Sequence, residues 1–139
     1  MYKRILLAVD GSEHSLRAAE EAMKLGGSTT NCIIDAVHVV EFSKSKTEIL
    51  HAQSQEELEL KRREQLQPVE KLLTQGKIMC RLEIIHGEAA SAIIEYADKE
   101  NVDLIILGSR GLNVVQEMVL GSVSHKVLKL APCPVVIVK

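Results

Sequence analysis

Three glycines and one serine near the carboxyl end of the chain have the spacing of a phosphate-binding loop. They are Gly108, Gly111, Gly121 and Ser122, in the pattern G-x2-G-x9-G-S. We expect Gly108 and Gly111 to adopt positive φ and to let the backbone approach a ligand with no Cβ in the way. Successive N–H groups in such a turn can form an anion-binding concavity, and a helix starting near Ser122 adds free N–H groups and a positive dipole end. Spacing alone favours a phosphate site and an ordinary surface loop about equally.

Side-chain hydroxyls and one carboxylate extend this candidate site. Ser122 and Ser124 could donate to phosphate oxygens. Asp10, in the turn Asp10-Gly11-Ser12, could accept from a sugar hydroxyl or hold a divalent cation on the phosphates. The alternative for Asp10 is an Asx turn that starts a helix, and the sequence favours the two interpretations equally.

Several catalytic patterns are absent from the sequence. It has no G-x4-G-K-[ST] segment, so no P-loop lysine would reach the β- and γ-phosphates, and no G-x-G-x-x-G segment follows the first apolar run. The five histidines show no metal-binding spacing. Among them, His38 lies in an apolar run and is expected to be structural. His125 falls near the glycine loop, where it could contact a phosphate oxygen or face solvent, and solvent exposure is favoured. Phosphoryl transfer would therefore depend on Arg110 and a metal ion, which predicts slow turnover at most.

Five apolar runs must position these groups, and they alternate with segments of helical spacing. We expect strands at 4–10, 32–40, 78–85, 102–108 and 134–138. Ser12 can cap a first helix that Gly26-Gly27 ends. Pro68 lies within the helix-prone segment 48–75, so two helical pieces or a kink near Gln67 are expected there. Further helices are expected at 89–100, with Ala89, Ile93, Ile94 and Ala97 as its buried positions, and at 122–130.

The alternation of strands and helices predicts right-handed crossovers and a single-domain α/β fold over residues 1–139. We expect an open, parallel, five-stranded sheet in the flavodoxin-like order 3-2-1-4-5, with helices on both faces. In this order the winding reverses between strands one and four, and ligands bind at such a switch point. Because Asp10 and Gly108 end those two strands, the candidate polar groups should meet at one edge of the sheet.

Composition disfavours several other classes of protein. A net charge of −2 and only three aromatic residues argue against a nucleic-acid surface. The sequence contains no stretch of about 18 apolar residues, so it predicts no membrane span. The three cysteines are an odd number without a C-x-x-C pair, which disfavours a disulfide scaffold and a zinc site. We therefore expect a soluble cytoplasmic protein with reduced thiols and with neither nucleic-acid nor membrane partners.

Five segments, taken together, resemble the universal stress protein family. They are VDGS at 9–12, HV at 38–39, DLIILGSRG at 103–111, LGSV at 120–123 and APCPV at 131–135. They occur in order at suitable separations, and the resemblance covers essentially the whole chain. The G-x2-G-x9-G-[ST] spacing matches the signature of the family's ATP-binding branch. Two departures are Ala8, where some relatives have proline, and Glu88-Ala89, which lacks a proline often found before the third helix; neither belongs to the phosphate loop.

The resemblance implies an adenine-nucleotide site and assigns residues to its parts. Asp10 would contact the ribose or adenine, and Val39 would line the adenine pocket through its backbone. A Mg²⁺ or Mn²⁺ ion would bridge the phosphates of ATP, with ADP and AMP as alternative occupants. The residues implied to surround the nucleotide are Ala8, Val9, Asp10, Val39, Leu107, Gly108, Arg110, Gly111, Gly121, Ser122, Val123 and Ser124.

The resemblance also implies an assembly and a regulatory role. The strand from Val135 to Val138 would pair with its copy in a homodimer, which would cover an apolar edge strand. The implied function is a stress-response protein whose ATP occupancy changes a dimer surface or a partner interaction. One alternative is a slow ATPase, or a protein that phosphorylates itself on Ser122 or Ser124. The other is a nucleotide-free dimerisation module, against which the intact glycine spacing argues. The sequence identifies no catalytic residue and no downstream partner.

Overall fold

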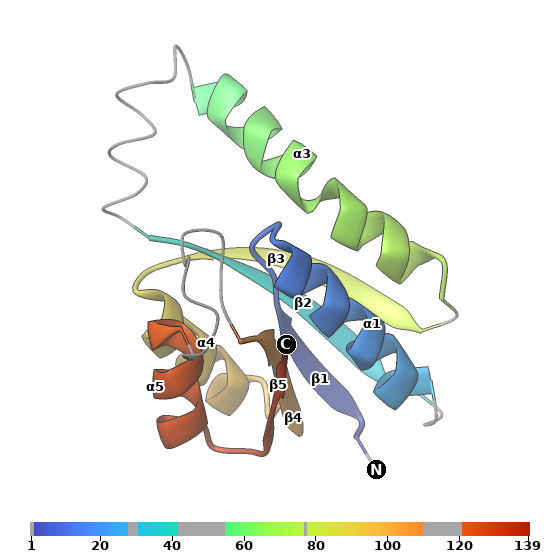
Figure 1. Cartoon of the computed structure of the whole chain (residues 1–139), viewed down its shortest axis with the longest axis vertical. Coiled ribbons are helices and arrows are strands. Elements are labelled where there is room, and N and C mark those ends of the chain that lie inside the picture. Colours follow the sequence, from blue (N-terminus) through green and yellow to red (C-terminus); the bar gives the residue numbers. More distant parts are fainter. Residues whose placement is uncertain (1, 28–30, 42–54, 77, 110–120) are drawn as a thin grey trace.

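Strand and helix alternate along the chain (Figure 1). A computed structural model describes residues 2–27, 31–41, 55–76, 78–109 and 121–139. Its strands are β1 (Arg4–Ala8), β2 (Ile33–Val40), β3 (Met79–His86), β4 (Leu104–Gly108) and β5 (Val135–Val138). Its helices are α1 (Glu13–Gly27), α3 (Gln55–Thr74), α4 (Ala89–Lys99) and α5 (Ser122–Leu130). All five predicted strands are present, each with ends within two residues of the expected ones.

The strands pair in parallel in the order β3-β2-β1-β4-β5, as predicted. The chain moves outward from β1 to β2 and β3, then crosses back over β1 to β4 and β5. α1 and α3 cover one face of the sheet, and α4 and α5 cover the other (Figure 1). This division follows from the strand order, because right-handed crossovers that run in opposite directions place their helices on opposite faces.

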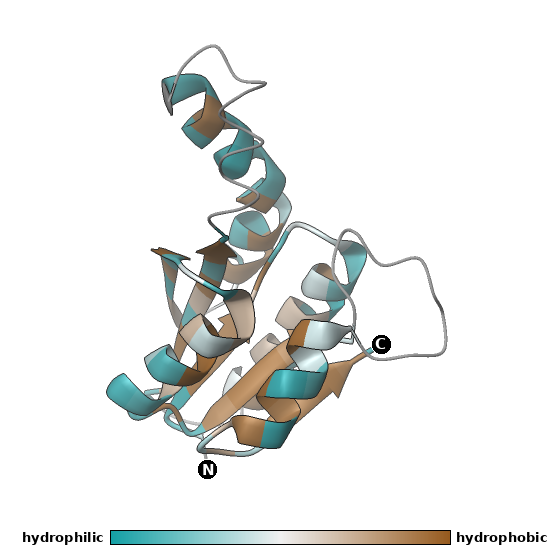
Figure 2. Ribbon diagram, turned by 90° about the vertical axis from the view of Figure 1, so that its left-hand side faces the viewer, coloured by the Kyte–Doolittle hydropathy of each residue, from teal (hydrophilic) through white to brown (hydrophobic). Residues whose placement is uncertain are grey.

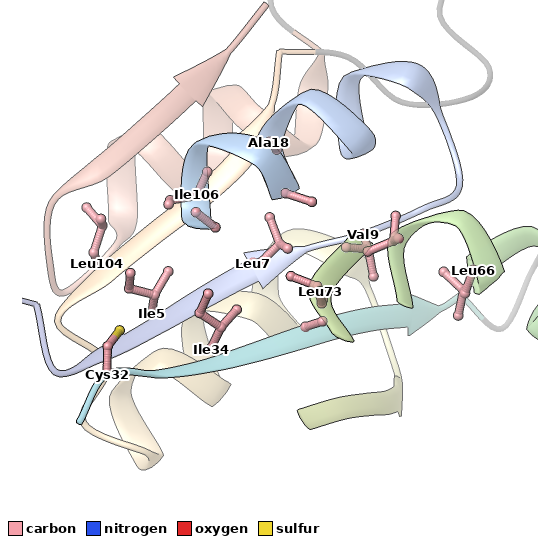
Figure 3. Close-up of a cluster of buried hydrophobic side chains, with 14 residues drawn as sticks. Ile5, Leu7, Val9, Ala18, Cys32, Ile34, Leu66, Leu73, Leu104 and Ile106 are labelled. Atoms are coloured by element: carbon pink, nitrogen blue, oxygen red, sulfur yellow. The ribbon is translucent and has the colours of Figure 1, made fainter. Parts of the chain in front are cut away.

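The central strands bury side chains on both faces of the sheet. Along β1, Ile5 and Leu7 point into the layer under α1 and α3, whereas Leu6 points into the layer under α4 and α5. All three side chains are fully buried, and burying each contributes about 1.5–3 kcal/mol. Figure 3 shows the first layer, where Leu66 and Leu73 of α3 lie among the strand residues.

The hydrophobic residues concentrate in the sheet, while the outer surfaces of the helices are more hydrophilic (Figure 2). Helix α3 in particular is largely hydrophilic and extends beyond the sheet at its N-terminal end (Figures 1 and 2). Across the described ranges, no helix combines the length and the apolar character needed to cross a bilayer.

The start of α1 confirms the predicted serine cap. The N–H of Ser15 donates to the Ser12 hydroxyl oxygen at 3.1 Å, so this oxygen satisfies one of the free N–H groups in the first turn. Small residues line the buried face of the helix, namely Ala18, Ala19 and Ala22. They let α1 approach the sheet closely, beside the strand end that carries Asp10.

Helix α3 continues through Pro68, so the first expected alternative, a division into two helical pieces, is wrong for residues 55–74, and the second, a kink near Gln67, stays a prediction. Pro68 is exposed, so the carbonyl that loses its N–H partner lies on the side of the helix that water can reach. On the opposite side Leu66, Val69 and Leu73 are buried against the sheet and hold the helix in place. The predicted helical residues 48–54 lie outside the described part of the chain.

The buried positions of α4 differ slightly from the predicted ones. They are Ala90, Ile93 and Ala97, whereas Ala89 and Ile94 are half-buried. The observed spacing of three and four residues keeps one narrow stripe toward the sheet, and Ala89 and Ile94 flank that stripe.

A buried carboxylate lies in β2, on the face covered by α4 and α5. Asp35 is fully buried, and its oxygens accept from Arg4 Nε at 2.8 Å, Arg81 Nε at 3.0 Å and the Tyr96 hydroxyl at 3.1 Å. These donors come from β1, β3 and α4, so the group ties three elements to β2. Burial, followed by the Asp35 charge, raises the pKa of Tyr96 to about 12.

The three cysteines, Cys32, Cys80 and Cys133, are free thiols, as expected. Cys32 is buried and the other two are half-buried. Burial raises the pKa of each thiol, which keeps it protonated and unreactive at neutral pH. Their role in this structure is packing.

Candidate functional site

The candidate polar groups lie at the carboxyl ends of β1 and β4, which are neighbouring strands. Leu7 of β1 is in register with Ile106 of β4. Continuing this register by a few residues places the Asp10 turn beside Gly108 and Ser109, at the point where the winding of the sheet reverses. The predicted meeting of the two loops at one edge is therefore confirmed for the described residues.

The turn after β1 is an Asx turn. Asp10 Oδ1 accepts from the Ser12 N–H at 2.9 Å, and the Asp10 N–H donates to the Ser15 hydroxyl at 3.1 Å. Gly11 has a φ of +85°, a conformation that side chains rarely allow, and an added Cβ would lie 3.1 Å from the Gln65 carbonyl oxygen. A carboxylate can accept about four hydrogen bonds, so the turn does not exhaust Asp10 as an acceptor.

The start of α5 is fixed to the ends of β4 and β5. The Gly121 N–H donates to the Ser109 carbonyl at 2.7 Å, and the Ser109 N–H donates to the Val138 carbonyl at 2.8 Å. The Ser124 hydroxyl donates to the Gly108 carbonyl at 2.6 Å, and Ser124 is buried. This hydroxyl is therefore engaged within the protein, so the predicted donation from it to a phosphate is not available in this arrangement.

Gly108 differs from its predicted conformation. It is the last residue of β4 and does not have a positive φ, so that expectation is wrong. Its carbonyl is the one that Ser124 binds, because a strand residue can still direct its peptide groups toward a neighbouring helix. Among the described glycines at this edge, Gly11 after β1 and Gly87 after β3 have positive φ instead, of +85° and +143°.

The first turn of α5 presents N–H groups that the helix itself cannot use. Gly121 is the N-cap and, having no side chain, makes no side-chain hydrogen bond to the first turn. The first intrahelical bond in this turn runs from the His125 N–H to the Gly121 carbonyl at 3.0 Å. The N–H groups of Ser122, Val123 and Ser124 therefore point out of the helix start, where the dipole favours an anion.

The end of β2 lies beside the Asp10 turn. His38 donates from Nδ1 to the Val9 carbonyl at 2.9 Å, which confirms the structural role expected of this histidine. Val39, the next residue, is half-buried. His125, the other histidine considered, is exposed on α5.

Most of the predicted nucleotide residues gather at this edge. Two of them, Arg110 and Gly111, lie outside the described residues. The side chains of Val9 and Leu107 are buried in the two core layers, so these two residues can face a ligand through their backbone only. Ser122 is exposed, and Val123 packs against the core from the side. The remaining predicted residues at the edge are Ala8, Asp10, Val39, Gly108, Gly121 and Ser124.

Sequence reasoning missed a polar cluster between α4 and α5. Glu88 caps α4 by accepting from the Ser91 N–H at 3.0 Å and from the Ser91 hydroxyl, and Lys126 Nζ lies 3.2 Å from the same carboxylate. The Ser91 hydroxyl and N–H, together with Lys126, lower the pKa of Glu88 to about 2. The signal was present as a carboxylate three residues before Ser91 at a helix start. No group of three or more His, Cys, Asp or Glu side chains arranged for a metal occurs in the described ranges.

Comparison with known proteins identifies one family. The profile of the universal stress protein family matches residues 1–139. Universal stress protein MJ0531 of Methanocaldococcus jannaschii is 32% identical over 146 residues, covering 100% of this chain and 83% of the relative.

Solved structures agree with the fold. Hypothetical protein MJ0577 matches with a TM-score of 0.85 and 28% identity, over 100% of this chain and 96% of the other. A universal stress protein solved with cAMP has a TM-score of 0.74 at 20% identity, and the match covers 99% of this chain and 97% of the other. The universal stress protein from Archaeoglobus fulgidus solved with dAMP has a TM-score of 0.75 at 20% identity, and the match covers 99% of this chain and 98% of the other. At such identities the last two support the fold alone.

Proposed function

Because this chain belongs to the universal stress protein family, we propose that it is a regulatory module that binds an adenine nucleotide, ATP above all. The observation that carries the proposal is the start of α5. Its outward N–H groups at Ser122, Val123 and Ser124 lie at the same sheet edge as the Asp10 turn. The complexes of family members with cAMP and dAMP are consistent with this choice of ligand.

Each part of the nucleotide has a partner of suitable chemistry in the proposed site. The phosphates would accept from the N–H groups at the start of α5, where the helix dipole is positive. Asp10 would accept from the ribose hydroxyls, and the backbone of Val39 would face the adenine. Arg110, Gly111 and a bridging Mg²⁺ or Mn²⁺ ion complete the site in this proposal, the metal being held mainly through the phosphates.

Sensing is favoured over catalysis in this proposal. Phosphoryl transfer needs positioned charge around the phosphates, and the sequence contains no P-loop lysine. Of the two serines considered as self-phosphorylation sites, Ser122 is exposed, whereas Ser124 is buried with its hydroxyl bound to Gly108. Any slow self-phosphorylation would therefore fall on Ser122.

A homodimer through β5 is also part of the proposal. β5 is the last strand of the sheet, and its four residues are apolar and half-buried in the single chain. An edge of this kind is stabilised when another strand pairs with it. Native mass spectrometry would report a mass of two chains, and would report a bound nucleotide at the same time. A cytoplasmic location belongs to the proposal as well, and free thiols are typical of a reducing compartment.

Thermal shift titration tests the nucleotide site. A chain of 139 residues loses about 0.3 kcal/mol of stability per degree near its Tm. ATP at 100 times its Kd should add about 2.7 kcal/mol, which raises the Tm by about 9 °C. ADP, AMP and GTP, each with and without Mg²⁺, would establish the preference.

Gly121→Val should abolish the ATP-dependent shift, because a branched side chain at the N-cap would block the approach of phosphates to the start of α5. Gly27→Val is the matched control, since Gly27 is exposed and an added Cβ there would have its nearest neighbour at 3.9 Å. A wild-type protein that no adenine nucleotide shifts would refute the proposed function. An unchanged shift in the Gly121 variant would refute the phosphate position, and sustained ADP release would favour an ATPase.

A further inference from the structure

The pairing of β1 with β2 ends with a side-chain hydrogen bond in place of a backbone one, at the edge where the adenine is proposed to bind. The ladder runs in register from Arg4 and Ile33 to Ala8 and Val37. It is extended by one further bond, from the Val9 N–H to the Val37 carbonyl at 2.9 Å. In a continuing parallel ladder, the Val9 carbonyl would next accept from the Val39 N–H.

A side chain takes that place instead. His38 Nδ1 lies 2.9 Å from the Val9 carbonyl oxygen. A carbonyl oxygen only accepts, so Nδ1 must carry the proton and donate. The imidazole N–H therefore satisfies the acceptor that the backbone of Val39 would otherwise pair with, and β1 turns away into the Asp10 loop.

The consequence falls on the peptide groups of Val39. Along a strand, successive residues direct their N–H and C=O groups to opposite neighbours. The Val40 carbonyl accepts from the Gly87 N–H on the β3 side, so the N–H and C=O of Val39 face the β1 side, past the point where β1 has left. Among the described residues, no backbone partner takes either group.

An unpaired donor beside an unpaired acceptor has a defined ligand preference. The base edge of adenine offers an amino donor next to a ring nitrogen acceptor, which complements a peptide C=O and N–H. Guanine offers an acceptor and a donor in the reverse order. A base that mismatches both peptide groups leaves them unsatisfied in the complex, which is how hydrogen-bonding sites reject analogues.

We propose that His38 is a positioning residue, which ends β1–β2 pairing at Val9 and so keeps the peptide groups of Val39 open to an adenine ring. This inference rests on the proposed nucleotide site and deepens it. His38 need not touch the ligand: its hydrogen bond to Val9 prevents the strands from closing by one more residue.

The first test is amide hydrogen exchange of Val39, measured by NMR in the nucleotide-free protein. The wild-type amide should exchange fast and become protected when ATP binds. In His38→Leu, the freed Val9 carbonyl should accept from Val39, so that its amide exchanges at least about tenfold more slowly without ATP. His38→Val is a second donor-free variant, suited to a strand, in case the leucine variant does not fold.

The second test is nucleotide preference. Both donor-free variants should bind ATP about tenfold or more weakly and lose much of the ATP-over-GTP preference, as expected for one or two lost hydrogen bonds. Tripolyphosphate affinity should not change, because the start of α5 is untouched. His38→Asn is the matched control, since its Nδ2 occupies the place of the imidazole Nδ1 and should restore both readouts.

Distinct results overturn the inference and the proposed function. Equal Val39 exchange in wild type and the donor-free variants would overturn the role of His38, even if wild type binds ATP well. An unchanged ATP-over-GTP preference in those variants would do the same. Failure of wild type to bind any adenine nucleotide would instead refute the proposed function, while the exchange comparison would still decide whether His38 holds the strands apart.

Discussion

Replacing Asp35 by asparagine tests how much the buried carboxylate in β2 stabilises the sheet. Asparagine fills nearly the same volume but carries no charge, so the change removes the anion that Arg4, Arg81 and Tyr96 bind. Removing one partner of a buried ion pair costs about 3–5 kcal/mol when the other charge stays buried. Here the side chains of Arg4 and Arg81 are 23% and 46% exposed and can turn to water. We therefore expect Asp35→Asn to lose about 2–3 kcal/mol.

Scanning calorimetry of the nucleotide-free protein at neutral pH would measure this loss. At about 0.3 kcal/mol per degree, the Tm should fall by about 7–10 °C. Asp98→Asn is the matched control, because Asp98 is exposed on α4 and its change should stay within about 2 °C. If Asp35→Asn moved the Tm no further than the control does, the buried group would not hold β1, β3 and α4 to β2 as we infer.

Two further changes probe local features. Gly11→Ala should lower the Tm by about 3–7 °C, because its φ of +85° and the Gln65 carbonyl 3.1 Å from a new Cβ together cost about 1–2 kcal/mol. Gly27→Ala is the control for Gly11→Ala, and equal Tm values for the two variants would contradict the predicted backbone strain at position 11. Glu88→Gln should lower stability at neutral pH but not near pH 2, since hydrogen bonds from Ser91 lower the Glu88 pKa from 4.5 to about 2. A carboxyl group whose pKa is lowered by folding stabilises the folded state at pH values above its unfolded-state pKa, and it loses that contribution as the pH falls through its folded-state pKa. A Tm difference between wild type and Glu88→Gln that is equal at pH 7 and near pH 2 would contradict this prediction.

Local sequence patterns were sufficient for the elements and their order. The apolar runs predicted every strand, because strands buried on both faces need continuous apolar residues. The start and end of α5 at 122–130 were also predicted, since the glycine before it and the proline after it act within one turn. Pro68 does not divide α3 into two helices, because burial of Leu66, Val69 and Leu73 outweighs one missing hydrogen bond on an exposed side.

The candidate site was predictable in place but not in detail. The strand order put Asp10 and Gly108 at one edge, where neighbouring parallel strands end together. Which atoms remain for a ligand depends on internal hydrogen bonds. The Ser124 hydroxyl is taken by the Gly108 carbonyl, 16 residues earlier in the chain, and no spacing rule foresees that choice.

What the sequence determined by itself is therefore the set of elements, their winding and the edge that carries the polar residues. These depend on burial and on contacts within a few residues, both of which a linear pattern records. Tertiary structure alone decided which polar groups are satisfied. His38 meets Val9 across 29 residues, and Asp35 meets Tyr96 across 61. Such pairs form only when packed strands and helices bring distant donors within about 3 Å of an acceptor, because hydrogen bonds weaken steeply with distance and angle.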